Sequence, residues 1–176
     1  ERPWGLFDAE TRTILFPDGI TSIGDNAFNG CNNLQQITLP TSLTTIGSNS
    51  FKDCINLESI NLGSGVKSIG ARAFSNCTKL SMVTGGENLE RIDAAAFHKC
   101  TGLTSFVIGK NMTYIGVNAF YGCSNMTSVI FEDVSTWYVS SDTKTQFLSD
   151  GNLMNSSTAA KYIRSSYIGY TWEKME

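Results

Sequence analysis

The spacing of the cysteines constrains the fold of this chain more than any other feature. All five lie 23 residues apart without a slip, at Cys31, Cys54, Cys77, Cys100 and Cys123. A fixed period of about 20 to 50 residues is typical of solenoids, in which each repeat buries its apolar face only against a stacked neighbour. The spacing therefore predicts an array of repeated coils.

The same period runs through the apolar positions. A phenylalanine stands three residues before every cysteine, at Phe28, Phe51, Phe74, Phe97 and Phe120. An isoleucine stands five residues before each phenylalanine, at Ile23, Ile46, Ile69, Ile92 and Ile115. The residue just before each phenylalanine is small, at Ala27, Ser50, Ala73, Ala96 and Ala119. We predict that these columns face the core and that the small residues leave room for the rings.

Each coil also contains a short segment with period-two alternation. The segments 34–39, 57–62 and 103–108 end in apolar residues separated by a polar one, which is typical of a half-buried strand. Stacked coils would align these strands in a parallel sheet with a spacing of roughly 4.8 Å. The third coil departs from the pattern, because Gly85 replaces an apolar residue.

Glycine follows the isoleucine in four coils, at Gly24, Gly47, Gly70 and Gly116. We expect these glycines to adopt a backbone conformation that a side chain would resist. Asp93 takes this place in the remaining coil, and aspartate tolerates left-handed geometry better than most residues.

Read as one unit, the pattern is L-x-x-I-x-L-(P/G)-x-x-L-x-x-I-G-x-x-A-F-x-x-C, which resembles the BspA-like leucine-rich repeats of bacterial and some protist surface proteins. The resemblance implies a leucine-rich repeat solenoid, a right-handed coil of about five to six 23-residue repeats with a parallel β-sheet on its concave face. We predict one structural domain in three parts: an N-terminal cap at 1–13, the repeats at 14–131 and a C-terminal capping segment at 132–176.

Aromatic residues mark the two predicted caps. All three tryptophans, Trp4, Trp137 and Trp172, lie outside the regular repeats, where they would cover the exposed ends of the solenoid. Residues 156–166 are expected to form a short helix with Ser156 or Ser157 as its N-cap. The alternative is a carbohydrate platform formed by Trp137, Tyr138, Tyr167, Tyr170 and Trp172.

Composition argues against several classes of partner. The 13 basic residues are scattered, whereas a nucleic-acid binder needs clustered Lys and Arg, so we expect no nucleic acid. We expect no membrane insertion either, because no apolar run is long enough to cross a bilayer. The chain starts at Glu1 without a charged and apolar leader, which suggests a mature or trimmed fragment whose export signal is not in this segment.

Catalytic and metal chemistry find little support. The cysteines lack the short spacings of metal ligands, and we interpret them as reduced, buried thiols that behave as small apolar side chains, with no metal site and no cofactor. The single histidine, His98, occupies a variable slot that we expect to face solvent, without a partner base. We therefore predict that the chain is not an enzyme.

The outward residues of the predicted sheet are the candidate partner-binding site. They form mostly small, uncharged columns in which Met82, Val107 and Ile130 provide an apolar focus toward the later coils. The candidate residues are Gln36, Thr38, Ser59, Asn61, Met82, Thr84, Ser105, Val107, Ser128 and Ile130.

Two functions fit this surface. The resemblance implies a surface or secreted module, extracellular or on the surface of a bacterium, that adheres to host matrix proteins or to proteins of neighbouring cells. A protein partner suits a shallow face best, although a glycan also fits it. The alternative is a passive structural or spacer element of the cell envelope. Capped ends argue against end-to-end stacking, so we expect a monomer.

Overall fold

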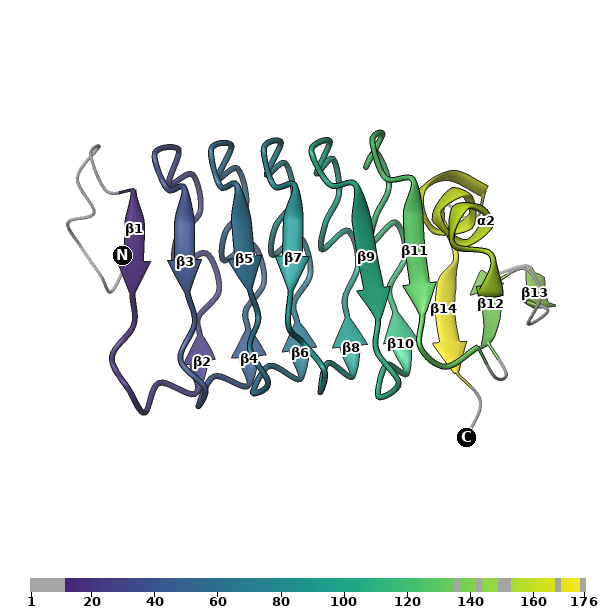
Figure 1. The fold of residues 1–176 in the computed structure, drawn as a ribbon, viewed down its shortest axis with the longest axis horizontal. Coiled ribbons are helices and arrows are strands. Elements are labelled where there is room, and N and C mark those ends of the chain that lie inside the picture. The colour runs from purple at the N-terminus through teal and green to yellow at the C-terminus, as the bar shows by residue number, and fades with distance from the viewer. Residues whose placement is uncertain (1–11, 135–136, 142–143, 149–152, 167–168, 175–176) are drawn as a thin grey trace.

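The computed structural model describes residues 12–134, 137–141, 144–148, 153–166 and 169–174 of the 176-residue chain. The described residues wind into a β-solenoid whose coils stand side by side in a nearly straight row (Figure 1). The predicted leucine-rich repeat solenoid is confirmed. The predicted N-terminal cap, including Trp4, lies almost entirely outside the described residues.

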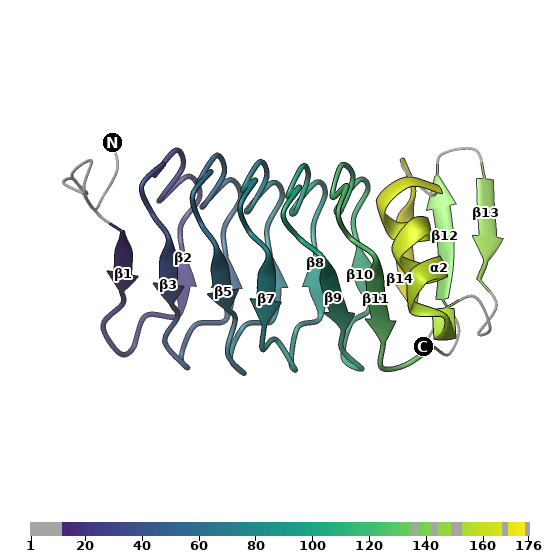
Figure 2. The same ribbon diagram turned by 45° about the horizontal axis from the view of Figure 1, so that its top comes forward.

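Two rows of strands run along the solenoid, one strand of each row in every coil (Figures 1 and 2). The row of longer strands comprises β1 (Thr13–Leu15), β3 (Gln36–Thr38), β5 (Ser59–Asn61), β7 (Met82–Thr84), β9 (Ser105–Ile108) and β11 (Ser128–Phe131). The row of shorter strands comprises β2 (Ser22–Ile23), β4 (Thr45–Ile46), β6 (Ser68–Ile69), β8 (Arg91–Ile92) and β10 (Tyr114–Ile115).

Strand pairing within both rows is parallel and follows the 23-residue period. Ile37 pairs with Ile60, and Ile46 pairs with Ile69, so equivalent residues of neighbouring coils lie opposite each other. The shorter strands form one continuous sheet, whereas the longer strands form a four-stranded sheet from β1 to β7 and a separate pair of β9 and β11. The row of longer strands is thus interrupted between β7 and β9.

The predicted core columns line the interior. The phenylalanine rings of successive coils stack almost parallel, with centroids 5.2–5.3 Å apart from Phe28 to Phe120. Every small residue before a phenylalanine is buried as well. Backbone hydrogen bonds hold the same segments together, because the amide of each phenylalanine from Phe28 to Phe97 donates to the small residue of the next coil, over 2.7–2.8 Å.

The glycines that follow the isoleucines do not adopt the unusual backbone conformation that we predicted for them. Gly24, Gly47, Gly70 and Gly116 are not among the residues with positive φ. At Gly47, Gly70 and Gly116 the constraint is the close approach of the preceding coil: a Cβ on Gly47 would lie 2.7 Å from the carbonyl oxygen of Ile23. A Cβ on Gly24, in the first of these coils, would meet no atom within 4 Å. Left-handed backbone occurs instead in two other columns, Asn26, Asn49, Arg72, Ala95 and Asn118, and Gly30, Asp53, Asn76, Lys99 and Gly122.

The C-terminal segment lies against the last coil. It contains β12 (Trp137–Ser141), β13 (Lys144–Phe147), the helix α2 (Ser156–Lys161), its π-helical continuation η1 (Tyr162–Ser166) and β14 (Thr171–Lys174). β14 pairs antiparallel with β10, and α2 contacts β11. The helix falls where predicted, but its N-cap is Asn155, whose side chain accepts a hydrogen bond from the amide of Thr158, and not Ser156 or Ser157.

The aromatic residues of this segment pack onto the end of the core. Trp137 and Trp172 are both buried, and each ring contacts Phe131, with centroids 5.4 and 6.1 Å away. These contacts are those that a capping role requires, because they extend the apolar stack beyond the last repeat. The role of residues 132–176 as a cap stays a prediction.

A serine in the core provides a test of the packing. Ser50 is fully buried, its hydroxyl has no hydrogen-bond partner among the described residues, and alanine occupies this place in the other coils. Because an unsatisfied buried hydroxyl costs about 1–3 kcal/mol, we expect Ser50→Ala to raise the free energy of unfolding by about 1 kcal/mol. The reciprocal change, Ala73→Ser, should lower it. Urea denaturation of both variants measures the effect, and a less stable Ser50→Ala variant would contradict it.

The left-handed columns provide a second test. Ala95 has a φ of 57°, a conformation that costs a residue with a Cβ about 1–2 kcal/mol. Glycine makes the unfolded chain more flexible, which offsets part of the gain. We expect Ala95→Gly to stabilise the protein by roughly 0.5–1 kcal/mol. Its neighbour Ala94 does not have positive φ, so Ala94→Gly should be destabilising; thermal unfolding of the two variants should shift in opposite directions.

Candidate binding surfaces

The outward side chains of β1, β3, β5, β7, β9 and β11 form one surface, which we call the long-strand face. All ten candidate site residues lie on it. Eight of them are exposed, and Ser59 and Ser128 are half-buried. The buried partners between them, such as Ile37 and Ile60, point into the core, as the period-two pattern predicts.

Strand register arranges the candidate residues in columns. Gln36, Ser59 and Met82 follow one another across β3, β5 and β7. A second column runs through Thr38, Asn61 and Thr84 on the same strands. Across β9 and β11, Ser105 pairs with Ser128 and Val107 pairs with Ile130.

Large apolar side chains are concentrated on this face. Met82, Val107 and Ile130 are 54%, 51% and 51% exposed, and Leu15 at the opposite end is 76% exposed. Together they are four of the seven large apolar side chains that are exposed among the described residues. The direct pairing of Val107 with Ile130 makes these two residues a contiguous apolar patch.

A hollow of about 220 Å³ adjoins this patch where the row of longer strands is interrupted. It is lined by Gly85, Gly86, Glu87, Val107, Gly109 and Glu132. Gly85 and Gly86 both have positive φ, and Gly85 stands where the neighbouring coils carry Leu62 and Ile108. The hollow thus places two carboxylates beside an exposed apolar side chain. Sequence reasoning missed it, although the loss of the apolar residue at Gly85 marks its position.

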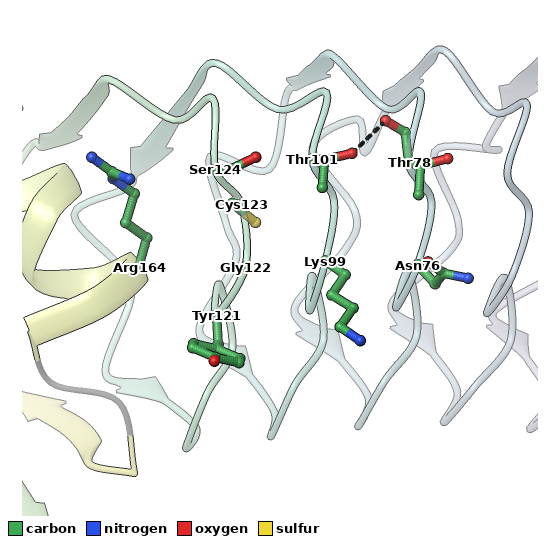
Figure 3. Close-up of a pocket in the computed structure, with 9 residues that line it drawn as sticks. All are labelled: Asn76, Thr78, Lys99, Thr101, Tyr121, Gly122, Cys123, Ser124 and Arg164. Carbon is green, nitrogen blue, oxygen red and sulfur yellow. Dashed lines mark hydrogen bonds between the residues drawn. The ribbon is translucent and has the colours of Figure 1, made fainter.

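A second hollow, of about 480 Å³, extends from the C-terminal helix across the last three coils (Figure 3). We call it the junction pocket. Its lining residues are Asn76, Thr78, Lys99, Thr101, Tyr121, Gly122, Cys123, Ser124 and Arg164. Arg164 belongs to η1, 40 residues beyond Ser124, so repeat periodicity carries no signal that would bring them together.

The alternative hypothesis of an aromatic carbohydrate platform was wrong. Trp137 and Trp172 are 1% and 2% exposed, so neither indole face is available to a sugar. Tyr138 is half-buried, and its hydroxyl donates a 2.6 Å hydrogen bond to Glu173. Tyr170 packs against the core, and Tyr167 lies outside the described residues.

The cysteines are free thiols, as predicted, but two details differ. Cys31 is half-buried, while the other four are buried. Each buried thiol also donates a hydrogen bond to a phenylalanine carbonyl of the preceding coil, as Cys77 does to Phe51 over 3.1 Å. The column therefore connects coils by weak polar contacts in addition to packing.

Burial makes these thiols poor nucleophiles. Removal from water raises the pKa of Cys77 and of Cys100 well above that of an ordinary thiol. A thiolate is the reactive form of cysteine, so neither residue fits a catalytic or redox role.

No side-chain hydrogen bond joins His98 to another residue in the described part of the chain. It is half-buried, not fully solvent-facing as expected, and its ring stacks on Tyr121 with centroids 5.6 Å apart. Desolvation lowers its pKa, and the positive charges of Lys99 and Arg72 lower it further. Within the described part of the chain, no three His, Cys, Asp or Glu residues are grouped so that they could hold a metal ion. None of the described helices has the length and apolar character needed to span a membrane.

These features define a β-solenoid of the leucine-rich repeat class, with two surface hollows in the part of the chain that the structure describes. The repeats match the BspA type leucine rich repeat region, in six copies over residues 7–136. The chain belongs to this family, whose members are often surface proteins and are typically non-enzymatic. No curated protein matches the sequence.

Several solved structures resemble the chain. A leucine rich repeat protein of T. pallidum shares 30% identity with a TM-score of 0.66, over 68% of this chain and 58% of its own length. A leucine rich cell surface protein of Faecalibacterium prausnitzii shares 27% identity with a TM-score of 0.54, over 72% of this chain and 40% of its own. The pneumococcal vaccine antigen PcpA, 24% identical, shares the fold with a TM-score of 0.64, over 81% of this chain and 36% of its own. The chain therefore spans 36–58% of the length of these three relatives.

Thiol accessibility tests the assignment of the cysteines. We expect a thiol-specific reagent to modify Cys31 readily in the native protein and to modify the four buried thiols only after unfolding, when all five react. Ellman's assay with and without denaturant measures the two populations. In a Cys31→Ser variant the rapid reaction should disappear, and a second rapidly reacting thiol would contradict the assignment.

Proposed function

We propose that this chain is a non-enzymatic binding module that adheres to a protein partner through the long-strand face. The observation that carries the proposal is the exposed Val107–Ile130 pair next to the hollow with its two carboxylates. The partner would be a protein of the host matrix or of a neighbouring cell surface, and the module would be displayed outside a bacterial cell.

The apolar patch supplies a physical anchor for such a partner. Val107 and Ile130 are both about half exposed, and each would lose apolar surface to a partner side chain. Burial contributes roughly 25 cal/mol per Å², and interface energy is concentrated in a few such residues. The surrounding Thr84, Ser105 and Ser128 offer small polar groups of the kind found at an interface rim.

The adjoining carboxylates indicate the charge of the partner. Glu87 and Glu132 line the hollow beside Val107, and one oxygen of Glu132 accepts a 3.3 Å hydrogen bond from the amide of Lys110. Each carboxylate can accept several hydrogen bonds, so the hollow suits a Lys or Arg side chain. The proposed epitope is therefore an apolar side chain flanked by a basic one.

The position of the patch also supports a binding role. It lies at the break between β7 and β9, the one place where the long row loses its continuous ladder among the described strands. Repeat proteins use extended sheet surfaces for binding, and departures from regular local structure are expected at functional sites. A passive spacer would need neither the exposed apolar pair nor the interruption.

Substitution of the patch tests the proposal. We expect the native chain to bind at least one member of a panel of immobilised matrix proteins or bacterial surface proteins in biolayer interferometry. Val107→Glu combined with Ile130→Glu should weaken this binding by about tenfold or more, because the anchor becomes charged and hydrated. Glu87→Gln combined with Glu132→Gln should weaken it less, and mainly at low salt.

A matched control tests whether added negative charge, irrespective of its position, weakens binding. Ser22→Glu combined with Thr45→Glu adds the same charge on the row of shorter strands, where both residues are exposed, and should leave binding unchanged. Thermal unfolding verifies that all variants fold. Failure of the native chain to bind any member of the panel would favour the spacer function, and equal loss in the control would overturn the assignment to the long-strand face.

A further inference from the structure

We propose that the junction pocket binds the carboxylate of an acidic saccharide, with Arg164 as the recognition residue. This site is separate from the long-strand face and does not depend on the proposed protein partner. The chemical class is a sugar that carries a carboxylate, either a uronic acid or a sialic acid.

The side chain of Arg164 is the starting point. It extends from η1 alongside the coil that carries Tyr121 and Ser124 (Figure 3). Its Nε atom is buried and has no hydrogen-bond partner among the described residues. A ligand in the pocket cannot reach this buried nitrogen, so recognition would use the edge formed by the two terminal guanidinium nitrogens, which matches the two oxygens of a carboxylate in a bidentate pair.

The charge around the pocket favours an anion. Residues 72–79, 95–102 and 118–125, which form this side of the last three coils, contain Arg72, Lys79 and Lys99 but no Asp or Glu. This is a local reversal in a chain whose net charge is −3. Lys99 lines the pocket together with Arg164. Desolvation is the main cause of the lowered pKa of His98, and the positive charges of Lys99 and Arg72 lower it further.

Asp53 of the neighbouring coil contacts the pocket residue Asn76, but its carboxylate is already paired. Asp53 accepts a 2.9 Å hydrogen bond from the side chain of Asn76 and lies 3.2 Å from the ammonium of Lys52. These two contacts lower the pKa of Asp53, with the Asn76 hydrogen bond as the largest cause. Neither Lys99 nor Arg164 forms an ion pair among the described residues, so both remain available to a ligand.

Hydroxyl groups and one aromatic ring favour a sugar over a simple anion. The hydroxyl of Thr101 donates to the carbonyl of Thr78 over 3.2 Å and keeps its lone pairs for a ligand hydroxyl. Ser124 ends the same column, and its hydroxyl has no partner among the described residues. Tyr121 is 41% exposed, and it is the last member of its column, so only one face of its ring is stacked, on His98. The other face can contact the apolar side of a sugar ring.

The size of the pocket agrees with this ligand class. Small-molecule sites have volumes of roughly 300–1,000 Å³, and the junction pocket has about 480 Å³. Arg164 and the coil residues reach the pocket from different elements, so the site exists only when the C-terminal segment is docked on the last coils.

Saccharide titration tests the proposal. Isothermal calorimetry or ligand-observed NMR at low salt would compare sialyllactose and a hyaluronan hexasaccharide with the neutral sugars lactose and chitohexaose. We expect one of the two acidic saccharides to bind and neither neutral sugar to do so; which acidic sugar binds identifies the source of the carboxylate. Arg164→Gln should weaken binding by roughly tenfold. Arg164→Lys, which keeps the charge but loses the planar fork, should restore little of it.

Controls distinguish recognition from charge and from misfolding. Lys99→Gln changes a residue on the coil surface and should also weaken binding, so the proposal does not depend on Arg164 variants alone. Lys110→Gln removes one exposed positive charge outside the pocket and should have no effect. Thermal unfolding must show that each variant is folded. The proposal is overturned if no acidic saccharide binds, if the Arg164 and Lys99 variants bind as tightly as the native chain, or if a single-stranded oligonucleotide of similar charge competes equally well.

Discussion

The contact between one coil and the next is the interaction on which the rest of this structure depends. Three kinds of interaction act at the same boundary. Phenylalanine rings stack with centroids 5.2–5.3 Å apart, and the phenylalanine amides donate backbone hydrogen bonds of 2.7–2.8 Å. The thiol of each buried cysteine donates a hydrogen bond to a carbonyl of the preceding coil. A single coil has no interior of its own, so each boundary stabilises two coils at once. The spacing of these contacts sets the tight approach that excludes a Cβ at Gly47 and Gly70.

Both candidate surfaces occur where this regularity ends or is broken. On the long-strand face, Gly85 and Gly86 have positive φ and depart from the regular backbone of the coils. The apolar pair Val107 and Ile130 is exposed beside this break. At the junction pocket, the C-terminal helix places Arg164 against coils that otherwise repeat small polar residues. A perfectly periodic solenoid repeats the same shallow surface, whereas an irregular coil or a docked segment creates a hollow with distinct chemistry.

Much of the fold was predictable because one 23-residue pattern is repeated in every coil. Columns of Phe, Ile and Cys identify the buried face, and alternation from Gln36 to Thr38 identifies a strand with one exposed side. The outward residues of the candidate site follow from the same alternation. The glycine that follows the isoleucine in four coils was assigned the wrong cause, because a pattern suggests that a side chain is excluded but does not show whether φ or a neighbouring coil excludes it. The aromatic residues of the tail were ambiguous for a similar reason, since Trp137 and Trp172 suit either a core or a platform.

By itself, the sequence determined the solenoid, its period, its core columns and the face that each strand residue occupies, because all of these depend on contacts between equivalent positions 23 residues apart. Only the tertiary structure decided how the nonrepeating tail docks, which buried the tryptophans against Phe131 and placed Arg164 in the same pocket as Ser124 and Lys99. It also decided that the long row breaks after β7 and leaves a hollow there. These features depend on packing between segments that share no period, and local sequence patterns carry no information about such contacts.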